Sequence, residues 1–177
     1  MIKNISKQEQ YVLNGPSIKI ENICNFDEEI QKQFTELFKN QLEPLYGSQE
    51  EDTLRKIFIV KDRTAKVILN DQNCILGILV YKDNPVTEYG INDALEIKTL
   101  MFIDPEQNGG KGLGAILIEE AEKVAHEKNI FSYFVTVAED KQESQQFFLK
   151  HGFVIHSRLT NAYRDGNIET IFKKELQ

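Results

Sequence analysis

The chain is poor in the residues that build disulfides and metal sites. It has two cysteines and three histidines among 177 residues. Cys24 and Cys74 have no histidine beside them, and His126, His151 and His156 form no metal-ligand spacing with them. We therefore predict no metal site, and we expect both cysteines to be small buried hydrophobic residues of a reducing compartment.

Long apolar runs and an excess of positive charge are also missing. No apolar stretch approaches the roughly 20 residues that a membrane-spanning helix needs. The stretch 1–7 lacks the apolar core of a secretory signal, so a cytoplasmic protein is expected. The formal net charge of −7 argues against nucleic acid or a membrane as a partner. This charge suits cationic amine substrates weakly, and solubility alone explains it equally well.

What is present is the composition of a globular domain. Hydrophobic residues make up 41% and charged residues 28%, which is ordinary for a soluble protein. A chain of this length is expected to form one domain that buries about 70% of its unfolded surface. We predict a single domain over 1–177, in which the polar segment 1–16 is a loose arm or edge strand.

Hydrophobic periodicity predicts alternating strands and helices. The helices are expected to begin with capping boxes at Asn25/Glu28 and Asp140/Glu143. The predicted strands are 17–24, 64–70, 74–81, 95–103, 130–137, 153–159 and 168–173, and the helices are 25–44, 48–58, 113–128 and 140–152. This order predicts a mixed α/β fold: a mostly antiparallel sheet of about six to seven strands, about four flanking helices and one βαβ crossover.

The run Gly109-Gly110-Lys111-Gly112-Leu113-Gly114 stands where that crossover turns from strand to helix. Glycines let the backbone approach a ligand, and the first N–H groups of a helix lack intrahelical partners. Together with the helix dipole, they favour a bound phosphate or pyrophosphate. The alternative is a plain strand-to-helix turn. Neither the Walker pattern nor the dinucleotide fingerprint fits this run.

Three segments carry a family likeness. The stretch 97–105 is similar to a strand "L-x-V-x-P", 110–117 to a pyrophosphate turn and its helix, and 147–153 to a segment "F-Y-x-K-x-G-F". Together they resemble the GNAT superfamily of acetyl-CoA-dependent N-acetyltransferases, over about residues 94–155. The order of the elements extends the likeness over most of the chain. It implies the GNAT fold, with acetyl-CoA as co-substrate.

The resemblance also implies which residues bind acetyl-CoA. In this family the pantetheine arm lies between two splayed strands like an added strand. One backbone amide polarises the thioester carbonyl, and losing such a donor typically costs about 10²–10³ in rate. The implied residues are Met101, Phe102, Ile103, Gln107, Asn108, Gly109, Gly110, Lys111, Gly112, Leu113, Gly114, Ala115, Lys141 and Phe148.

The family turn reads Gln/Arg-x-x-Gly-x-Gly, and two registers fit it. Pairing its glycines with Gly112 and Gly114 is preferred, because this leaves Leu113 on the buried side of the helix. The loop before the turn is then one residue longer than usual, and Gln107 or Asn108 could fold over the phosphates. The other register, shifted by two residues, puts Gln107 at the Gln/Arg position.

Two positions depart from the family pattern. Phe148 stands where the family often has the tyrosine that protonates the CoA thiolate, and Lys141 stands where it often has asparagine. The proton then comes from Tyr133, Tyr163 or water, or no acid is needed. These departures also support the alternative function, a non-catalytic acyl-CoA-binding or protein-interaction module.

Glu96 is the predicted general base. It precedes the apolar residues of the strand 95–103, and a carboxylate or water chain must deprotonate an incoming ammonium. The alternative is an exposed residue at the start of a strand. Glu88 and Asp93 are weaker candidates for gripping the ammonium.

The predicted activity is transfer of an acetyl group from acetyl-CoA to a primary amine by direct attack in a ternary complex. The resemblance places acceptor contacts in 38–58, 83–93 and 159–167. A peptide N-terminus, a lysine, a polyamine, an antibiotic and a small metabolite all remain open as acceptors. A homodimer is frequent in the family and stays an option here.

Overall fold

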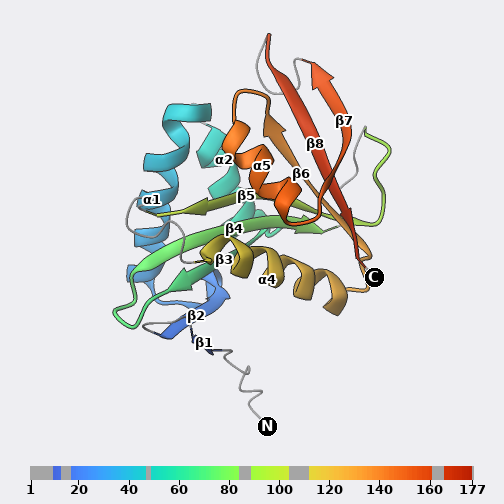
Figure 1. The fold of residues 1–177 in the computed structure, drawn as a ribbon. Coiled ribbons are helices and arrows are strands. Elements are labelled where there is room, and N and C mark those ends of the chain that lie inside the picture. The colour runs from blue at the N-terminus through green and yellow to red at the C-terminus, as the bar shows by residue number, and fades with distance from the viewer. Residues whose placement is uncertain are drawn as a thin grey trace. The chain divides into compact units, whose positions relative to one another are not determined.

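The computed structural model describes residues 10–12, 17–46, 49–83, 89–103, 112–160 and 166–176 (Figure 1). It divides into two compact units, Met1–Leu79 with Met101–Leu113 and Val80–Leu100 with Gly114–Gln177. Strands β4 (Ile75–Asp83) and β5 (Ala94–Phe102) each contribute residues to both units.

In the first unit, strands β1 (Gln10–Val12), β2 (Ser17–Asn22), β3 (Thr64–Leu69) and β4 are neighbours in that order. β1 and β3 both pair antiparallel with β2, and β3 and β4 form the predicted hairpin. β1 lies in the segment that was expected to be an arm or an edge strand.

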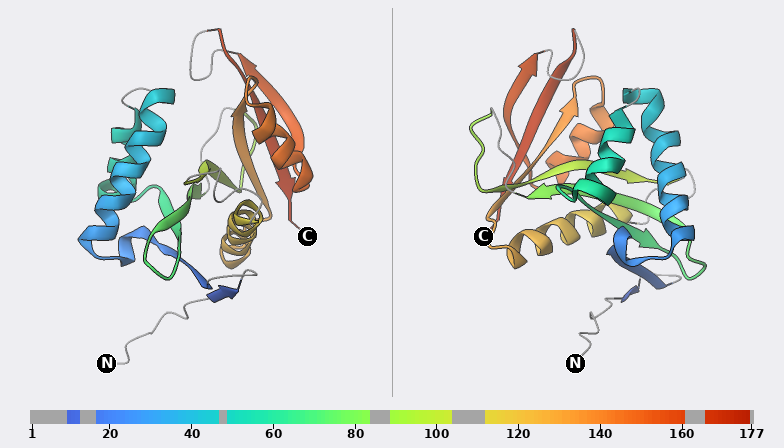
Figure 2. Two further views of the ribbon diagram at one scale, coloured as in Figure 1. Left: turned by 60° about the vertical axis from the view of Figure 1, so that its left-hand side comes forward. Right: turned by 180° about the vertical axis from the view of Figure 1, so that it is seen from behind.

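The described residues of the first unit also form the helices α1 (Glu28–Tyr46) and α2 (Gln49–Arg55) (Figure 2). A π-helical turn, η2 (Lys56–Val60), continues α2. Ile30, Phe34 and Phe38 recur every four residues on α1, and all three are buried. The Phe34 ring stacks on Phe38 at 5.4 Å and meets Phe58 of η2 edge-on at 5.9 Å. These aromatic contacts fix the helices to each other.

The start of α1 differs from the prediction. Asp27, and not Asn25, provides the cap, because its Oδ1 accepts a hydrogen bond from the Ile30 N–H at 3.1 Å. Residues 23–25 instead form a short 3₁₀ turn, η1 (Ile23–Asn25). The Asn22 side chain caps this turn by accepting from the Cys24 N–H at 2.9 Å.

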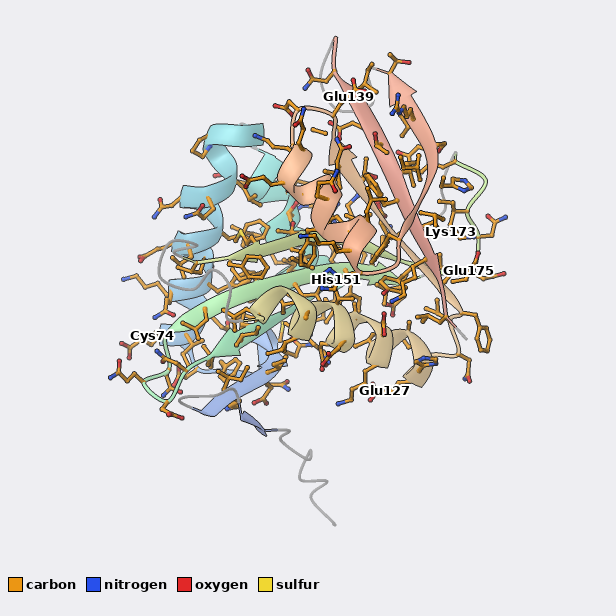
Figure 3. All side chains as sticks on the ribbon, in the orientation of Figure 1. Cys74, Glu127, Glu139, His151, Lys173 and Glu175 are labelled. Atoms are coloured by element: carbon orange, nitrogen blue, oxygen red, sulfur yellow. The ribbon has the colours of Figure 1, made fainter. Side chains whose placement is uncertain are left out.

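The prediction that both cysteines are buried is wrong. Cys24 and Cys74 are exposed free thiols. Cys24 lies in η1 rather than in a strand, and Cys74 lies in the turn between β3 and β4, where Figure 3 labels it. Asn70 organises this turn, because its Oδ1 accepts from the Cys74 N–H at 2.9 Å.

In the second unit, the order of neighbouring strands is β4, β5, β6 (Ser132–Ala138), β8 (Ile168–Glu175) and β7 (Val154–Thr160). β5 and β6 run parallel, and β8 is antiparallel to both β6 and β7. Helix α4 (Leu113–Glu127) connects β5 to β6, which confirms the predicted βαβ crossover. The register between β7 and β8 shifts at Ile155/Ser157.

Both faces of these strands are covered. Phe148 of α5 (Gln142–Lys150) packs on Phe153 and Phe172, with ring centroids 5.1 and 6.3 Å apart. On the opposite face, Phe134 and Ile171 form a buried cluster with Ile91 and Ala94. The observed order and strand directions confirm the predicted mixed α/β fold class.

The cap of α5 also differs from the prediction. The helix begins at Gln142, and its N-cap residue Lys141 makes no capping side-chain hydrogen bond. The predicted box at Asp140/Glu143 is therefore wrong. The helix ends at Lys150, and Gly152 follows with a φ of +83°. That left-handed conformation lets the chain turn directly into β7.

Candidate active site

Glu96 is a buried carboxylate on β5. Its exposed fraction is 7%, so the alternative of an exposed strand-start residue does not hold. The Lys98 ammonium lies 2.8 Å from Glu96 Oε1, with one-fifth of its own side chain exposed. Residues two apart in a strand share a face, which explains the pairing. The sequence analysis did not single out Lys98, although this spacing was visible.

The ladder between β5 and β6 ends early. Its pairs run from Ala94/Ser132 to Ile97/Val135, whereas β5 continues to Phe102 and β6 to Ala138. Among the described residues no ladder pair joins the two strands beyond these positions. β6 remains paired with β8 along its whole length, so the edge of β6 that faces away from β8 is open past Val135. An unpaired strand edge of this kind can accept another extended chain as an added strand.

Thr136 adds a polar atom at this point. It follows Val135 directly on β6, and its Oγ1 is buried without a hydrogen-bond partner in the described part of the protein. A buried hydroxyl without a partner is costly, so a water or a bound polar group is expected to satisfy it. The sequence analysis missed Thr136, because nothing in its neighbourhood distinguishes it from other strand threonines.

Met101, Phe102 and Ile103 are half-buried at the end of β5. The Ile103 N–H donates to the Leu76 carbonyl at 2.9 Å, so this amide faces β4. Since successive residues of a strand direct their N–H groups to opposite edges, the Phe102 N–H faces the edge away from β4. An added strand on the edge of β5 away from β4 needs an N–H that points toward it. Of these three amides, the Phe102 N–H points that way.

The glycine turn is described only at its end. Gln107, Asn108, Gly109, Gly110 and Lys111 lie outside the described residues. Gly112 is exposed with a φ of +76°, and an added Cβ there would meet nothing within 4 Å. The left-handed backbone, and not crowding, therefore requires glycine at this position.

Helix α4 begins at Leu113, directly after Gly112. Leu113, Ile116 and Leu117 are buried. Gly114 and Ala115 belong to the first turn, which has no acidic residue. An anion near these N–H groups would therefore meet no opposing carboxylate within that turn.

Lys141 and Phe148, both expected to contact the cofactor, have different surroundings. Lys141 is about half exposed, and its Nζ lies 3.9 Å from Asp140 Oδ2. Phe148 is 5% exposed within its aromatic cluster. It has no proton to give and little surface to offer a ligand.

Tyr133, one of the acids considered, is fully buried and engaged. Its hydroxyl donates to Glu122 Oε1 at 2.5 Å, and the same oxygen accepts from Lys174 Nζ at 2.5 Å. Burial, followed by the hydrogen bond to Glu122, raises the pKa of Tyr133 far above its usual value. This phenol is therefore a poor proton donor to any other group. The other candidate, Tyr163, and the weaker candidate Glu88 lie outside the described residues, and Asp93 is exposed.

The first unit carries a surface groove of about 620 Å³ along α1, α2 and η2. Two ion pairs lie along it: Lys39 is 3.9 Å from Glu51, and Arg55 is 3.1 Å from Asp52. Hydrogen bonds from Lys56 and then from Arg55 hold the pKa of Asp52 below its usual value. The charges of the groove are thus largely balanced, so they select no ligand charge.

In the described ranges, no cluster of His, Cys, Asp or Glu side chains could hold a metal ion. None of the helices described is long and apolar enough to cross a membrane.

Similarity to a family model places the chain in a known class of protein. The chain belongs to the acetyltransferase (GNAT) family, whose family model matches residues 29–153. The likeness seen in the sequence is thereby confirmed. A curated relative, the uncharacterized protein YxbD of Bacillus subtilis (strain 168), is 30% identical over 95 residues, which are 54% of this chain and 53% of that protein. The chain thus spans about half the length of this relative.

Solved structures show the same fold at low identity. Arabidopsis thaliana NAA60, in complex with a bisubstrate analogue, matches with a TM-score of 0.71 and 13% identity, over 90% of this chain and 98% of that chain. An aminoglycoside 6′-N-acetyltransferase complexed with coenzyme A matches with a TM-score of 0.68 and 14% identity, over 88% of this chain and 96% of that chain. Ard1 from Thermoplasma volcanium matches with a TM-score of 0.66 and 18% identity, over 90% of this chain and 98% of that chain.

Proposed function

We propose that this chain moves an acetyl group from acetyl-CoA to a primary amine by direct attack in a ternary complex. The observation that supports this most strongly is on β5: a buried carboxylate, Glu96, lies where the ladder between β5 and β6 comes to an end. A proton acceptor and an open strand edge are thus neighbours on one element.

The open edge suits the pantetheine arm of acetyl-CoA. An extended arm with amide groups can bond a strand edge as an added strand does. The backbone of Met101, Phe102 and Ile103 would hold it, and the Phe102 N–H has the required direction. The Thr136 hydroxyl, which lacks a partner among the described residues, would find one in a bound polar group.

The pyrophosphate is assigned to the glycine turn and the start of α4. Backbone N–H groups and the helix dipole bind an anion there, and Lys111 adds a positive charge. Lys141 and Phe148 complete the set of residues assigned to cofactor binding. Phe148 is assigned a packing role and no direct contact with the cofactor. The turn residues of this assignment are Gln107, Asn108, Gly109, Gly110, Lys111, Gly112, Leu113, Gly114 and Ala115.

In this assignment Glu96 removes a proton from the acceptor ammonium, directly or through water. The neutral nitrogen then attacks the thioester carbonyl carbon, and an amide of β5 stabilises the negative charge on the carbonyl oxygen. The C–S bond breaks as the amide bond forms. Because Tyr133 is held by Glu122 and Phe148 has no proton, the thiolate takes a proton from Tyr163 or water, or leaves unassisted. The nitrogen gives its second proton to water as the amide forms.

Phe148 and Lys141, the two departures from the family pattern, favour a second candidate, a non-catalytic acyl-CoA-binding or protein-interaction module. Neither function specifies the acceptor. Contacts to it are proposed from 38–58, 83–93 and 159–167, and the groove along α1, α2 and η2 lies partly in the first of these.

Thermal unfolding with and without millimolar acetyl-CoA tests the binding. At 100 times its Kd a ligand adds about 2.7 kcal/mol, or about 5 to 11 °C for a domain of this size. Gly112→Val, which forces a β-branched residue into a left-handed conformation, should remove this shift. No shift in the unaltered protein would exclude the transferase and the acyl-CoA-binding module.

Release of CoA in the presence of an amine panel separates the two candidates. A transferase releases CoA only with a suitable amine, and a binding module never does. Glu96→Gln should then lower kcat by about 10²–10⁴ with little change in the KM for acetyl-CoA. Glu21→Gln is a matched control, because Glu21 forms the same kind of in-strand pair with Lys19 on β2. Equal effects of the two substitutions would exclude Glu96 as the base.

A cytoplasmic location and a homodimer remain predictions. Cell fractionation tests the first, and sedimentation of the purified chain tests the second.

A further inference from the structure

The pair formed by Glu96 and Lys98 points to a modification site within the chain itself. We propose that Lys98 is an internal acetyl acceptor, acetylated on Nζ by the acetyl-CoA that this protein binds. The proposal rests on the proposed function, since it takes both acetyl-CoA binding and the role of Glu96 from there.

The amine of Lys98 lies within hydrogen-bond distance of the proposed base. A general base must lie within hydrogen-bond reach of the proton that it removes. Lys98 Nζ is 2.8 Å from Glu96 Oε1, and Lys98 carries the functional group of the proposed acceptors, a primary ammonium. One carboxylate oxygen of Glu96 is thus already hydrogen-bonded to an amine of the same strand.

Lys98 is also a near neighbour, along β5, of the residues assigned to acetyl-CoA. Lys98 lies three residues before Met101, the first residue assigned to the pantetheine arm, or about 10 Å along β5. The flexible four-carbon stem of a lysine can move its amine over part of that distance. Holding amine, base and thioester on one element makes the reaction effectively unimolecular.

The step balances without any further reactant. Glu96 takes one proton from the Lys98 ammonium, and the neutral nitrogen attacks the thioester carbonyl carbon. The C–N bond forms, the C–S bond breaks, and a second proton of the nitrogen passes to the departing sulfur. The products are acetyl-Lys98, which keeps one N–H hydrogen, and free CoA.

The protein supplies its own controls. Among the described residues, two other lysines form in-strand pairs with a glutamate two residues away. Lys19 lies 3.1 Å from Glu21 on β2, and Lys173 lies 2.7 Å from Glu175 on β8, where Figure 3 labels both residues. The side chains of Lys19 and Lys173 are 31% and 23% exposed, against 20% for Lys98. Uncatalysed acetylation in solution should therefore favour the two controls.

The experiment is incubation of the full chain with isotopically labelled acetyl-CoA and no added amine, followed by tryptic peptide mass spectrometry. Trypsin does not cut after acetyl-lysine, so the peptides 83–98 and 99–111 are replaced by a single peptide, 83–111. Acetylation of Lys98 should be about 10²-fold faster than that of Lys19 or Lys173. Its first-order rate constant should not change with protein concentration.

Two variants sharpen the result. Lys98→Arg keeps the positive charge beside Glu96 and should abolish the 83–111 peptide. Glu96→Gln should slow the labelling of Lys98 and leave that of Lys19 and Lys173 unchanged. The comparison of three lysines in the unaltered chain needs neither variant, so a folding defect in one of them leaves the test intact.

The outcomes separate this proposal from the proposed function. If acetyl-CoA stabilises the fold but Lys98 reacts no faster than Lys19 and Lys173, the internal acceptor is refuted while acetyl-CoA binding stands. A rate constant that rises with protein concentration refutes it too, because one molecule would then be acetylating another. If acetyl-CoA does not stabilise the fold at all, the proposed function fails first.

Discussion

Replacing Tyr133 by Phe isolates one hydrogen bond in the second unit. The ring stays in place, because its edge-on contact with Phe153 at 4.7 Å does not involve the hydroxyl. Only the bond from the hydroxyl to Glu122 is lost, and Lys174 still donates to the same carboxylate oxygen. The substitution therefore removes one donor without opening a cavity.

The expected cost follows from the exposure of the carboxylate. A hydrogen bond to a charged group contributes about 1.5–3 kcal/mol. The Glu122 side chain is 28% exposed, so water can replace part of the lost bond. We expect Tyr133→Phe to lower the free energy of unfolding by about 1 to 2 kcal/mol near pH 7, which lowers Tm by about 2 to 8 °C.

The difference in the free energy of unfolding between the unaltered protein and Tyr133→Phe should depend on pH, both in acid and in base. Burial acts to raise the pKa of Glu122, but hydrogen bonds from Lys174 and Tyr133 outweigh it, so this pKa lies below the usual 4.5. The unfolded chain then binds more protons in acid, and the stabilisation is lost as the pH falls below about 4.5. The pKa of Tyr133 is raised, so above about pH 10 only the unfolded chain ionises and stability falls with rising pH.

Thermal unfolding followed by circular dichroism at pH 3, 7 and 10.5 measures this difference. We expect it to be largest at pH 7 and smaller at both extremes. A difference below about 0.5 kcal/mol at pH 7, the usual range of an inert surface change, would refute the reasoning. The acetylation rate should not change, and a loss of about 10²-fold or more would identify Tyr133 as the acid after all.

The remaining predictions concern the aromatic cluster and the thiols. Phe148→Ala should lower the free energy of unfolding by about 3 to 5 kcal/mol, as measured by urea denaturation, because its ring packs on Phe153 and Phe172. Phe148→Tyr places a hydroxyl in this apolar cluster and should cost about 1 to 3 kcal/mol without increasing the acetylation rate. Cys24 and Cys74 should both react with a disulfide reagent in the native protein, since both thiols are exposed; full reaction only after unfolding would contradict this.

The strands and helices were predictable because hydrophobic residues recur along each of them at regular spacing. Phe34 and Phe38 are spaced four apart on a long helix, and the alternation in β3 is visible in the sequence. The caps were less predictable. Asn25 and Asp27 are both good N-cap residues with a plausible partner three positions on, and only the observed bond from Ile30 decides between them.

The candidate site was predictable in part. Sequence reasoning found Glu96 and the end of the glycine turn, because strand position and glycine spacing are local signals. It did not single out Lys98 or Thr136. The importance of Thr136 depends on where the ladder between β5 and β6 stops, which is a property of two strands and of no single segment.

The irregular register of β7 has a consequence for solubility. β7 is the last strand in its row, and Val154 and Ile155 are 64% and 49% exposed. A long, flat edge of this kind could template the addition of strands from other molecules. The shift between Ile155 and Ser157 interrupts the even spacing that an incoming strand would have to match. Deleting His156, which lies within this shift, should therefore straighten the edge and make concentrated solutions of the protein precipitate.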